Sequence, residues 1–194
     1  MSATDSPTDI LITRPRRADA RRNYDKVIAA ARAAFGEHGT STSLEEIARR
    51  AEVGIGTLYR NFPNRQALLE AVYVEELDSV CCAAAALDGT DPWVDFVDYI
   101  HGLVGYLVTK QALAHELLEY VDRDASFFQG CRGMLFQAGE PLLARAQAAH
   151  VVRTDTDLSQ VIQLIGGIAK IPGAAPETIE HLLQIALDGL RYRD

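Results

Sequence analysis

Apolar residues recur at intervals of three and four along almost the whole chain, which is the spacing of one face of an α-helix. The first such stretch begins near Ala18 and ends at the glycines of residues 36–39; its apolar positions are Tyr24, Val27, Ile28, Ala31 and Phe35. Strict alternation of apolar and polar residues, which would predict a β-strand, does not occur over a useful length. The pattern therefore predicts an all-α protein of about nine helices.

Two short helices are predicted next along the chain. Ser43 and Glu46 have the spacing of a capping box, and apolar residues at helical spacing follow, so we expect a helix over residues 44–50. Gly54 can cap a second helix over residues 55–61. Only the segment "AEV" separates the two helices. A pair with these dimensions is typical of a helix-turn-helix, in which the second helix lies in the major groove of DNA.

Helical spacing continues after this pair. We expect Asn64 to cap a long fourth helix, and further apolar stripes cover residues 92–109, 111–121, 125–151, 157–171 and 176–193. Residues 1–17 lack helical spacing and contain two prolines, so we expect a disordered tail there. Its arginines could act as a basic arm on DNA or remain solvated.

Charge is distributed unevenly along the sequence. The formal net charge is −8, but residues 1–66 carry +3 and residues 67–194 carry −11. A positive end attached to an acidic body is consistent with a protein that presents one end to nucleic-acid phosphates. No apolar run approaches the roughly 18–20 residues needed to cross a bilayer, so we expect a soluble, cytoplasmic protein that contacts no membrane.

The residue types needed for metal binding or catalysis do not form a recognisable pattern. The three cysteines, Cys81, Cys82 and Cys131, are an odd number without zinc-ligand spacing, so we expect reduced thiols. The five histidines lack metal-ligand spacing as well. No nucleophile, base and orienting group can be assembled. We therefore predict no metal, no cofactor, no catalytic residue and no enzymatic activity.

The segment "VGIGTLYRNFPNR", residues 53–65, concentrates glycines and hydrogen-bonding side chains between two predicted helices. Leu58 and Phe62 lie four residues apart and turn inward together, which leaves Gly56, Thr57, Arg60 and Asn61 facing mostly outward. Gly54 and Gly56 lack a Cβ, which lets the backbone come close to a phosphate.

The outward residues of the second short helix are of the types that contact DNA. Arg60 can make a bidentate contact with a guanine edge, and Asn61 can pair with adenine or hold a phosphate. The hydroxyls of Thr57 and Tyr59 can reach phosphates. Arg65, at the start of the next helix, can add a phosphate contact, although a cation at a helix N-terminus is unfavourable in isolation.

The stretch "TSTSLEEIARRAEVGIGTLYRNFPNRQALLEAV", residues 40–72, resembles the DNA-binding domain of the TetR family of bacterial transcriptional regulators. With the first helix included, the resemblance covers about residues 18–75, and the rest of the chain is similar in overall pattern to SbtR-like C-terminal domains. The resemblance implies a set of residues at the DNA, in which Arg65 stands where the family usually has lysine: Thr42, Ser43, Ile55, Gly56, Thr57, Tyr59, Arg60, Asn61 and Arg65.

Three of these residues also have a purely structural interpretation. Tyr59 could pack half-buried against the first helix instead of meeting a phosphate. Ile55 could belong to the core instead of contacting a thymine methyl group. Arg60 could be an ordinary solvated charge.

Several positions depart from the family pattern. Glu52 replaces the usual glycine of the turn, which costs on the order of 1 kcal/mol if the backbone there is left-handed. Gly54 replaces the usual capping serine, and Asn61 replaces a histidine. Tyr24 stands where the first helix often carries an arginine, which removes one expected phosphate contact.

The resemblance also implies the organisation of the whole chain: a tail at 1–17, a helix-turn-helix domain at 18–64 and a helical ligand-binding and dimerisation domain at 65–194. We expect a homodimer formed through residues 157–171 and 176–193, although both segments could instead be internal core. We expect a pocket for an unknown small-molecule effector, and the same residues could equally be core. The candidate lining residues are Trp93, Phe96, Ile100, His101, Tyr106, Tyr120, Phe128, Met134 and Phe136.

These features predict a ligand-responsive transcriptional regulator that binds double-stranded operator DNA, as a repressor released by its effector. The alternative is a helical small-molecule sensor or interaction module whose DNA-reading head has lost its function, since Tyr24, Glu52 and Asn61 all depart from the family pattern. An enzyme built on an α-helical bundle is the third possibility, and no residue constellation supports it.

Overall fold

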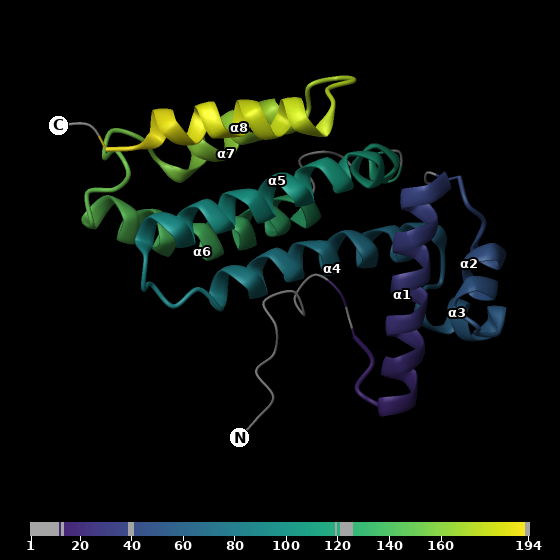
Figure 1. Ribbon diagram of the computed structural model, residues 1–194. Helices are drawn as coiled ribbons and strands as arrows, with labels where there is room; N and C mark the ends of the chain where they lie inside the picture. Colours follow the sequence, from purple (N-terminus) through teal and green to yellow (C-terminus); the bar gives the residue numbers. More distant parts are fainter. Residues whose placement is uncertain (1–11, 13, 39–40, 119, 121–125, 193–194) are drawn as a thin grey trace. The chain divides into compact units, whose positions relative to one another are not determined.

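The computed structural model describes residues 12, 14–38, 41–118, 120 and 126–192 (Figure 1). It contains eight helices, close to the nine expected: α1 (Ala18–His38), α2 (Leu44–Arg50), α3 (Ile55–Asn61), α4 (Arg65–Ala85), α5 (Pro92–Leu117), α6 (Ser126–Ala148), α7 (Leu158–Ala169) and α8 (Pro176–Leu190). The predicted all-α class is confirmed. The difference in number arises because the stripes at 92–109 and 111–121 join into the single helix α5.

The described residues form two compact units. The first comprises the described parts of residues 1–78 and 109–131, and the second comprises 79–108 and 132–192. The divisions therefore fall within α4, α5 and α6, each of which contributes to both units. None of the described helices is long and apolar enough to cross a membrane.

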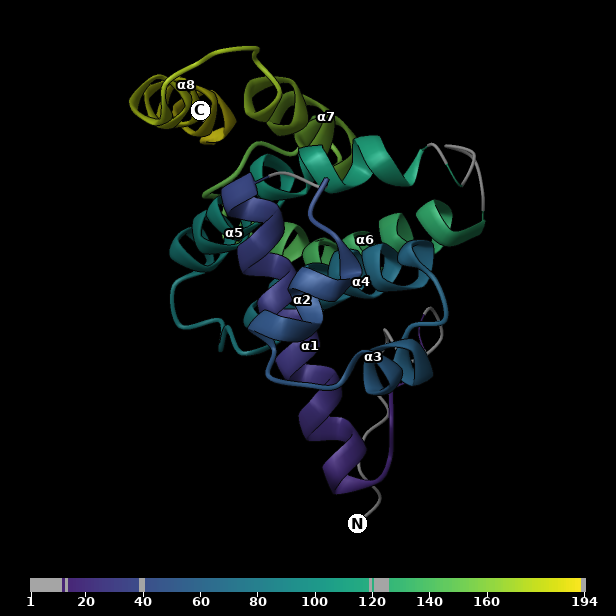
Figure 2. The same ribbon diagram turned by 90° about the vertical axis from the view of Figure 1, so that its right-hand side faces the viewer.

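In the first unit α1, α2 and α3 pack on one another (Figure 2). Their shared core contains Leu58 and Phe62 with Ile47 and Tyr24, all of them at most 2% exposed. The rings of Tyr24 and Phe62 lie 5.1 Å apart, centroid to centroid. Tyr24, at a position where the resemblance leads us to expect an arginine, is therefore a core residue of the three helices α1, α2 and α3.

Most of the predicted N-terminal tail, residues 1–11 and 13, lies outside the described residues. Arg14, however, is fixed on α4: its Nε donates to Glu75 at 2.8 Å and its Nη2 donates to Asp78 at 2.9 Å. The Arg14 side chain is almost fully buried, and the two carboxylates raise its pKa against the opposing effect of burial. Arg14 is thus an anchor for the chain that leads into α1, and Arg16 and Arg17 beside it are exposed.

In the second unit α5 packs closely against α6. The Tyr99 hydroxyl donates to the carbonyl of Leu135 at 2.9 Å, and burial raises its pKa. The Tyr99 ring occupies the space beside Gly139, where an added Cβ would lie 2.6 Å from ring atoms. Asp95, a buried carboxylate, accepts from the backbone N–H of Gly89 and from Arg145.

The helices α7 and α8 lie side by side in the same unit (Figure 1). Asp157 and Gln160 form a complete capping box at the start of α7, as the polar residues there favour. An isolated antiparallel bridge joins Val152 to Arg191 just beyond α8. Apart from this bridge, the described part of the chain contains no β-structure.

Replacement of Gly139 tests the close packing of α5 on α6. We expect Gly139→Ala to have a free energy of unfolding about 1–3 kcal/mol lower than Gly133→Ala, because a new methyl group at 139 collides with the Tyr99 ring. Gly133 lies on the same helix with open space around it, so both variants gain the same helix propensity. Urea unfolding followed by circular dichroism measures the difference; equal stabilities would contradict the packing.

Candidate nucleic-acid interface

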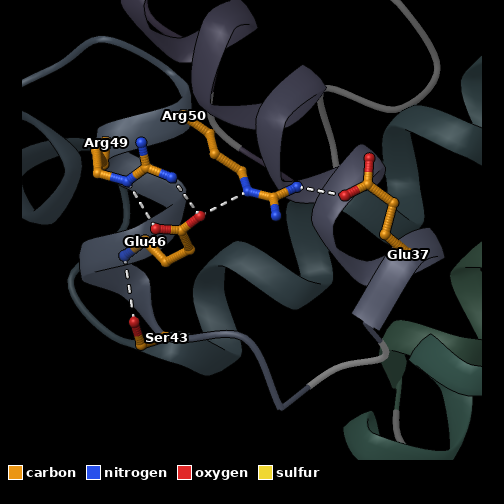
Figure 3. Close-up of polar contacts among 5 residues, drawn as sticks. All are labelled: Glu37, Ser43, Glu46, Arg49 and Arg50. Atoms are coloured by element: carbon orange, nitrogen blue, oxygen red, sulfur yellow. Dashed lines mark hydrogen bonds and ion pairs between the residues drawn. The ribbon is translucent and has the colours of Figure 1, made fainter.

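The start of α2 is capped by Ser43, whose Oγ accepts from the backbone N–H of Glu46 at 3.2 Å (Figure 3). The other half of the predicted capping box does not form. The Glu46 carboxylate instead accepts from Arg49 and Arg50, in each case at 2.8 Å. These hydrogen bonds from Arg49 and then Arg50 lower the pKa of Glu46 to about 2.

Arg50 also links α2 to α1, since its Nη1 donates to Glu37 at 2.7 Å (Figure 3). Glu46 therefore stays ionised and is neutralised by two cations. Glu46, the carboxylate whose backbone N–H bonds the predicted phosphate-facing residue Ser43, therefore presents little uncompensated negative charge to a nucleic acid.

The turn between α2 and α3 contains a left-handed residue. Glu52 has φ 55°, a conformation that favours glycine, and it occupies the position where the family usually has one. The expected strain at Glu52 is therefore present. The backbone N–H groups of Glu52 and Val53 bond back to the carbonyls of Arg49 and Ala48, which holds the turn in this shape.

Gly54 precedes α3 and caps it with its carbonyl, but it has no side chain to add a bond. The N–H groups of Thr57 and Leu58 donate to that carbonyl at 2.8 and 3.1 Å. Leu58 and Phe62 are buried, as expected, while Ile55 is 40% and Tyr59 44% exposed. Ile55 therefore does not belong to the core.

The polar side chains of α3 interact mainly with their own helix. Arg60 donates from Nε to the Gly56 carbonyl at 3.2 Å and from Nη2 to the Thr57 hydroxyl at 3.0 Å. Asn61 donates from Nδ2 to the Thr57 carbonyl at 2.9 Å. Arg60 and Gly56 are exposed, whereas Thr57 and Asn61 are half-buried. These short-range contacts orient the side chains and leave Arg60 at the surface.

Arg65 has protein partners that the sequence did not indicate. Its Nε donates to Glu116 on α5 at 2.6 Å, and its Nη1 donates to the Thr42 carbonyl at 2.7 Å. Its guanidinium also lies over the Phe35 ring, 5.8 Å from the ring centre. The unfavourable position of a cation at the start of α4 is therefore compensated within the protein, with no phosphate required. Glu116 is 51 residues away in sequence, so no local pattern could have identified it.

The structure does not gather the candidate ligand residues at one described cavity. Phe96, Ile100, Tyr106 and Met134 are buried core. The other five residues have different surroundings. The Arg191 guanidinium lies 3.9 Å from the centre of the Trp93 ring, and His101 Nε2 lies 3.5 Å from a carboxylate oxygen of Glu180. Phe128 packs on Tyr73 and Phe127, whereas Phe136 is half-buried and Tyr120 is exposed. Tyr120 and Phe128 belong to the first unit and the other seven to the second.

A surface hollow of about 410 Å³ lies elsewhere, at the end of α8 and the start of α7. None of its lining residues is among the candidate ligand residues, although six belong to the segments expected to form the dimer; the lining consists of Arg153, Asp155, Thr156, Gln160, Val161, Leu164, Ala186, Gly189 and Leu190. Within the described residues, no group of three or more His, Cys, Asp or Glu side chains could hold a metal ion.

Three helices that pack on one another, α1 to α3, precede the other helices of the chain, and the second helix of the helix-turn-helix pair, α3, has an exposed face. This arrangement defines the class of helix-turn-helix DNA-binding regulators. Comparison with family models identifies the family within this class. Residues 27–72 match the model for bacterial regulatory proteins of the tetR family, and residues 91–192 match the transcriptional regulator SbtR-like, C-terminal domain. The chain belongs to the TetR family of transcriptional regulators, as its sequence predicted, and is not an enzyme.

Solved structures agree with this assignment. The TetR transcriptional regulator SCO0520 from Streptomyces coelicolor is 34% identical, with 88% of this chain and 99% of that chain covered and a TM-score of 0.73. A TetR regulatory protein from Mycobacterium vanbaalenii is 29% identical (91% and 99% covered, TM-score 0.67). GusR from Salmonella enterica, 20% identical (91% and 98% covered, TM-score 0.63), shares the fold. A comparison with curated proteins found no match.

Replacement of Glu52 by glycine tests the strain in the turn. We expect Glu52→Gly to raise the free energy of unfolding by up to about 1 kcal/mol, because glycine adopts a positive φ without a steric penalty and loses only part of that gain to unfolded-chain entropy. The matched control Glu45→Gly, in the helical backbone of α2, should lower it by about 1 kcal/mol. Thermal unfolding compares the two, and a less stable Glu52→Gly protein would disprove the strain.

Proposed function

We propose that the protein is a ligand-responsive repressor that binds operator DNA as a homodimer and is released by a small molecule. The observation that carries this proposal is the two-sided character of α3, with Leu58 and Phe62 buried and Arg60 and Tyr59 exposed. A seven-residue helix held in this way presents a rigid polar surface of the size that enters a major groove.

In this proposal α3 supplies the base contacts. Arg60 leaves its weak intrahelical bonds for a guanine edge, which offers two acceptors in the geometry of the guanidinium. Ile55, exposed at the start of the helix, meets a thymine methyl group. The surface around Gly56 is open, because no atom beyond its chain neighbours and the backbone of α3 lies within 4 Å of the place where a Cβ would be. Without a side chain at this position, the backbone of α3 can come close to the DNA.

Phosphate contacts hold the head in register on the duplex. Tyr59 is exposed enough for its hydroxyl to reach a phosphate. Ser43 and Thr42 lie just before α2 and offer further hydroxyl groups, with Ser43 exposed. Thr57 and Asn61, both half-buried, support α3 and complete the set of residues proposed to contact DNA. Arg65, which the sequence also placed at the DNA, is left out of this set because its guanidinium bonds Glu116 and the Thr42 carbonyl.

Two heads are needed because one head covers only a half-site. Dimerisation through residues 157–171 and 176–193 is supported by exposed apolar side chains on α7 and α8, among them Leu164 and Ile185. A two-fold symmetric pair of these helices would bury the same side chains on both protomers and present two heads to a palindromic operator. Residue 193 lies outside the described residues.

Release by an effector follows from population shift. The dimer can adopt a spacing of its two DNA-binding heads that fits the operator and another that does not. A ligand that binds the second form more tightly lowers the affinity for DNA, by no more than the ratio of its affinities for the two forms. The second unit, which contains most of the candidate ligand residues, is the place we assign to that ligand. Because several of those residues are tightly packed, binding would require the core to open locally.

The DNA-binding proposal predicts a loss of base preference in Arg60→Ala. Selection from random duplexes should first enrich a palindromic sequence with wild-type protein. Arg60→Ala should then bind that sequence about 10–100-fold more weakly, because one bidentate base contact is worth about 1–3 kcal/mol, and should tolerate a changed base pair in each half-site. Fluorescence anisotropy at several salt concentrations measures both effects.

The matched control is Arg132→Ala, which removes an exposed cation from α6 and should leave specific binding unchanged. Affinity should fall steeply with salt for all three proteins. Failure of folded wild-type dimers to enrich any sequence would reject this function and favour the sensor without a working head.

The proposed dimer predicts that a charge on the outer face of α8 produces monomers. Ile185 is 55% exposed, and Ile185→Lys would place an unpaired ammonium group in the buried interface. We expect monomers at micromolar concentration by light scattering, while Val94→Lys, at a 47% exposed position on α5, remains dimeric. A dimeric Ile185→Lys protein would place the interface elsewhere.

A further inference from the structure

The guanidinium of Arg65 joins three elements of the first unit. It bonds the carboxylate of Glu116, in the last turn of α5, and the carbonyl of Thr42, just before α2, while Arg65 itself begins α4. The Arg65 and Glu116 side chains are 23% and 13% exposed, so water competes poorly for either group. Thr42 and Ser43 are the residues proposed to face phosphates at α2.

The chemistry of arginine makes this connection rigid. A guanidinium is planar and its N–H groups point in fixed directions, so bonds from Nε and Nη1 fix the position of one acceptor relative to the other. Both are charge-assisted bonds, and the Phe35 ring covers the guanidinium. The place of the Glu116 carboxylate therefore determines the place of the Thr42 carbonyl.

We propose that Glu116 is a positioning residue for DNA binding, which orients Arg65 so that the end of α5 fixes the phosphate-facing start of α2. The proposal rests on the DNA-binding function proposed above. Helix α5 belongs to the second unit over residues 92–108 and to the first over 109–117. Loss of the 2.6 Å bond to Glu116 removes this restraint from the start of α2.

Two simpler roles make different predictions. If Arg65 only binds phosphate, Glu116 competes with DNA, and its removal strengthens binding. If Glu116 only adds negative charge near DNA, its removal strengthens binding whether or not Arg65 is present. A positioning role instead requires that loss of Glu116 weakens binding and that this loss disappears once Arg65 is gone.

The first measurement is amide hydrogen exchange without DNA, in wild type, Glu116→Gln, Glu116→Ala and the control Glu70→Gln. Glu70 is a half-buried carboxylate on α4 that accepts from Gln66 and takes no part in the connection. We expect faster exchange at Glu46 and Ile47, in the first turn of α2, in both Glu116 variants. Leu58 in α3 and all amides of Glu70→Gln should exchange as in wild type.

The second measurement is affinity for the selected operator and for a random duplex. Glu116→Gln and Arg65→Gln should each weaken binding about ten-fold on both duplexes, and the double variant should be no weaker than either single variant. Glu70→Gln should bind as wild type. Circular dichroism verifies folding, and Glu116→Gln keeps the shape of the side chain should the alanine variant be unstable.

Unchanged exchange in the Glu116 variants, unchanged or stronger DNA binding by Glu116→Gln, or additive effects in the double variant would each overturn the positioning role. Wild-type protein that binds no duplex would reject the DNA-binding function itself. Hydrogen exchange tests the connection from Glu116 through Arg65 to Thr42 independently of DNA binding, because it is measured without DNA.

Discussion

The exposed face of α3, which is proposed to contact DNA, depends on the burial of two side chains, Leu58 and Phe62, on the opposite side of this seven-residue helix. A helix this short is unstable alone in water, because nucleation costs more than a few hydrogen bonds return. Burying each of these side chains contributes roughly 1.5–3 kcal/mol, which is enough to hold α3 in place. The orientation of Arg60 toward solvent is thus a consequence of packing on the opposite side.

The same constraint explains the positions at which this chain departs from its family. Tyr24 gives up an expected phosphate contact and supplies a ring that packs on Phe62, so it strengthens the support of α3. Glu52 introduces strain into the turn, and the backbone hydrogen bonds of the turn retain the conformation. Neither departure changes the exposed face of α3.

Local patterns predicted the helices well. The first residues of α2, α3 and α7 follow from the N-cap residues Ser43, Gly54 and Asp157, whose effects reach only three or four residues along the chain. Partners distant in sequence could not be predicted in this way: Glu116 has no local mark that connects it to Arg65. Aromatic residues of α5 and α6 also could not be divided between core and pocket, because both environments select the same side chains at the same helical spacing.

The arginines of the head differ in how readily a phosphate could recruit them. Arg49 is paired with Glu46 on an exposed surface, where water and salt weaken an ion pair, so DNA can displace the carboxylate at little cost. Arg14 is buried between two carboxylates, and its removal from them would leave charges unpaired in a poorly solvated site. Arg14 therefore serves the fold. Exposed cations that are unpaired or weakly paired, with Arg60 foremost, carry the electrostatic attraction to DNA that the acidic remainder of the chain opposes.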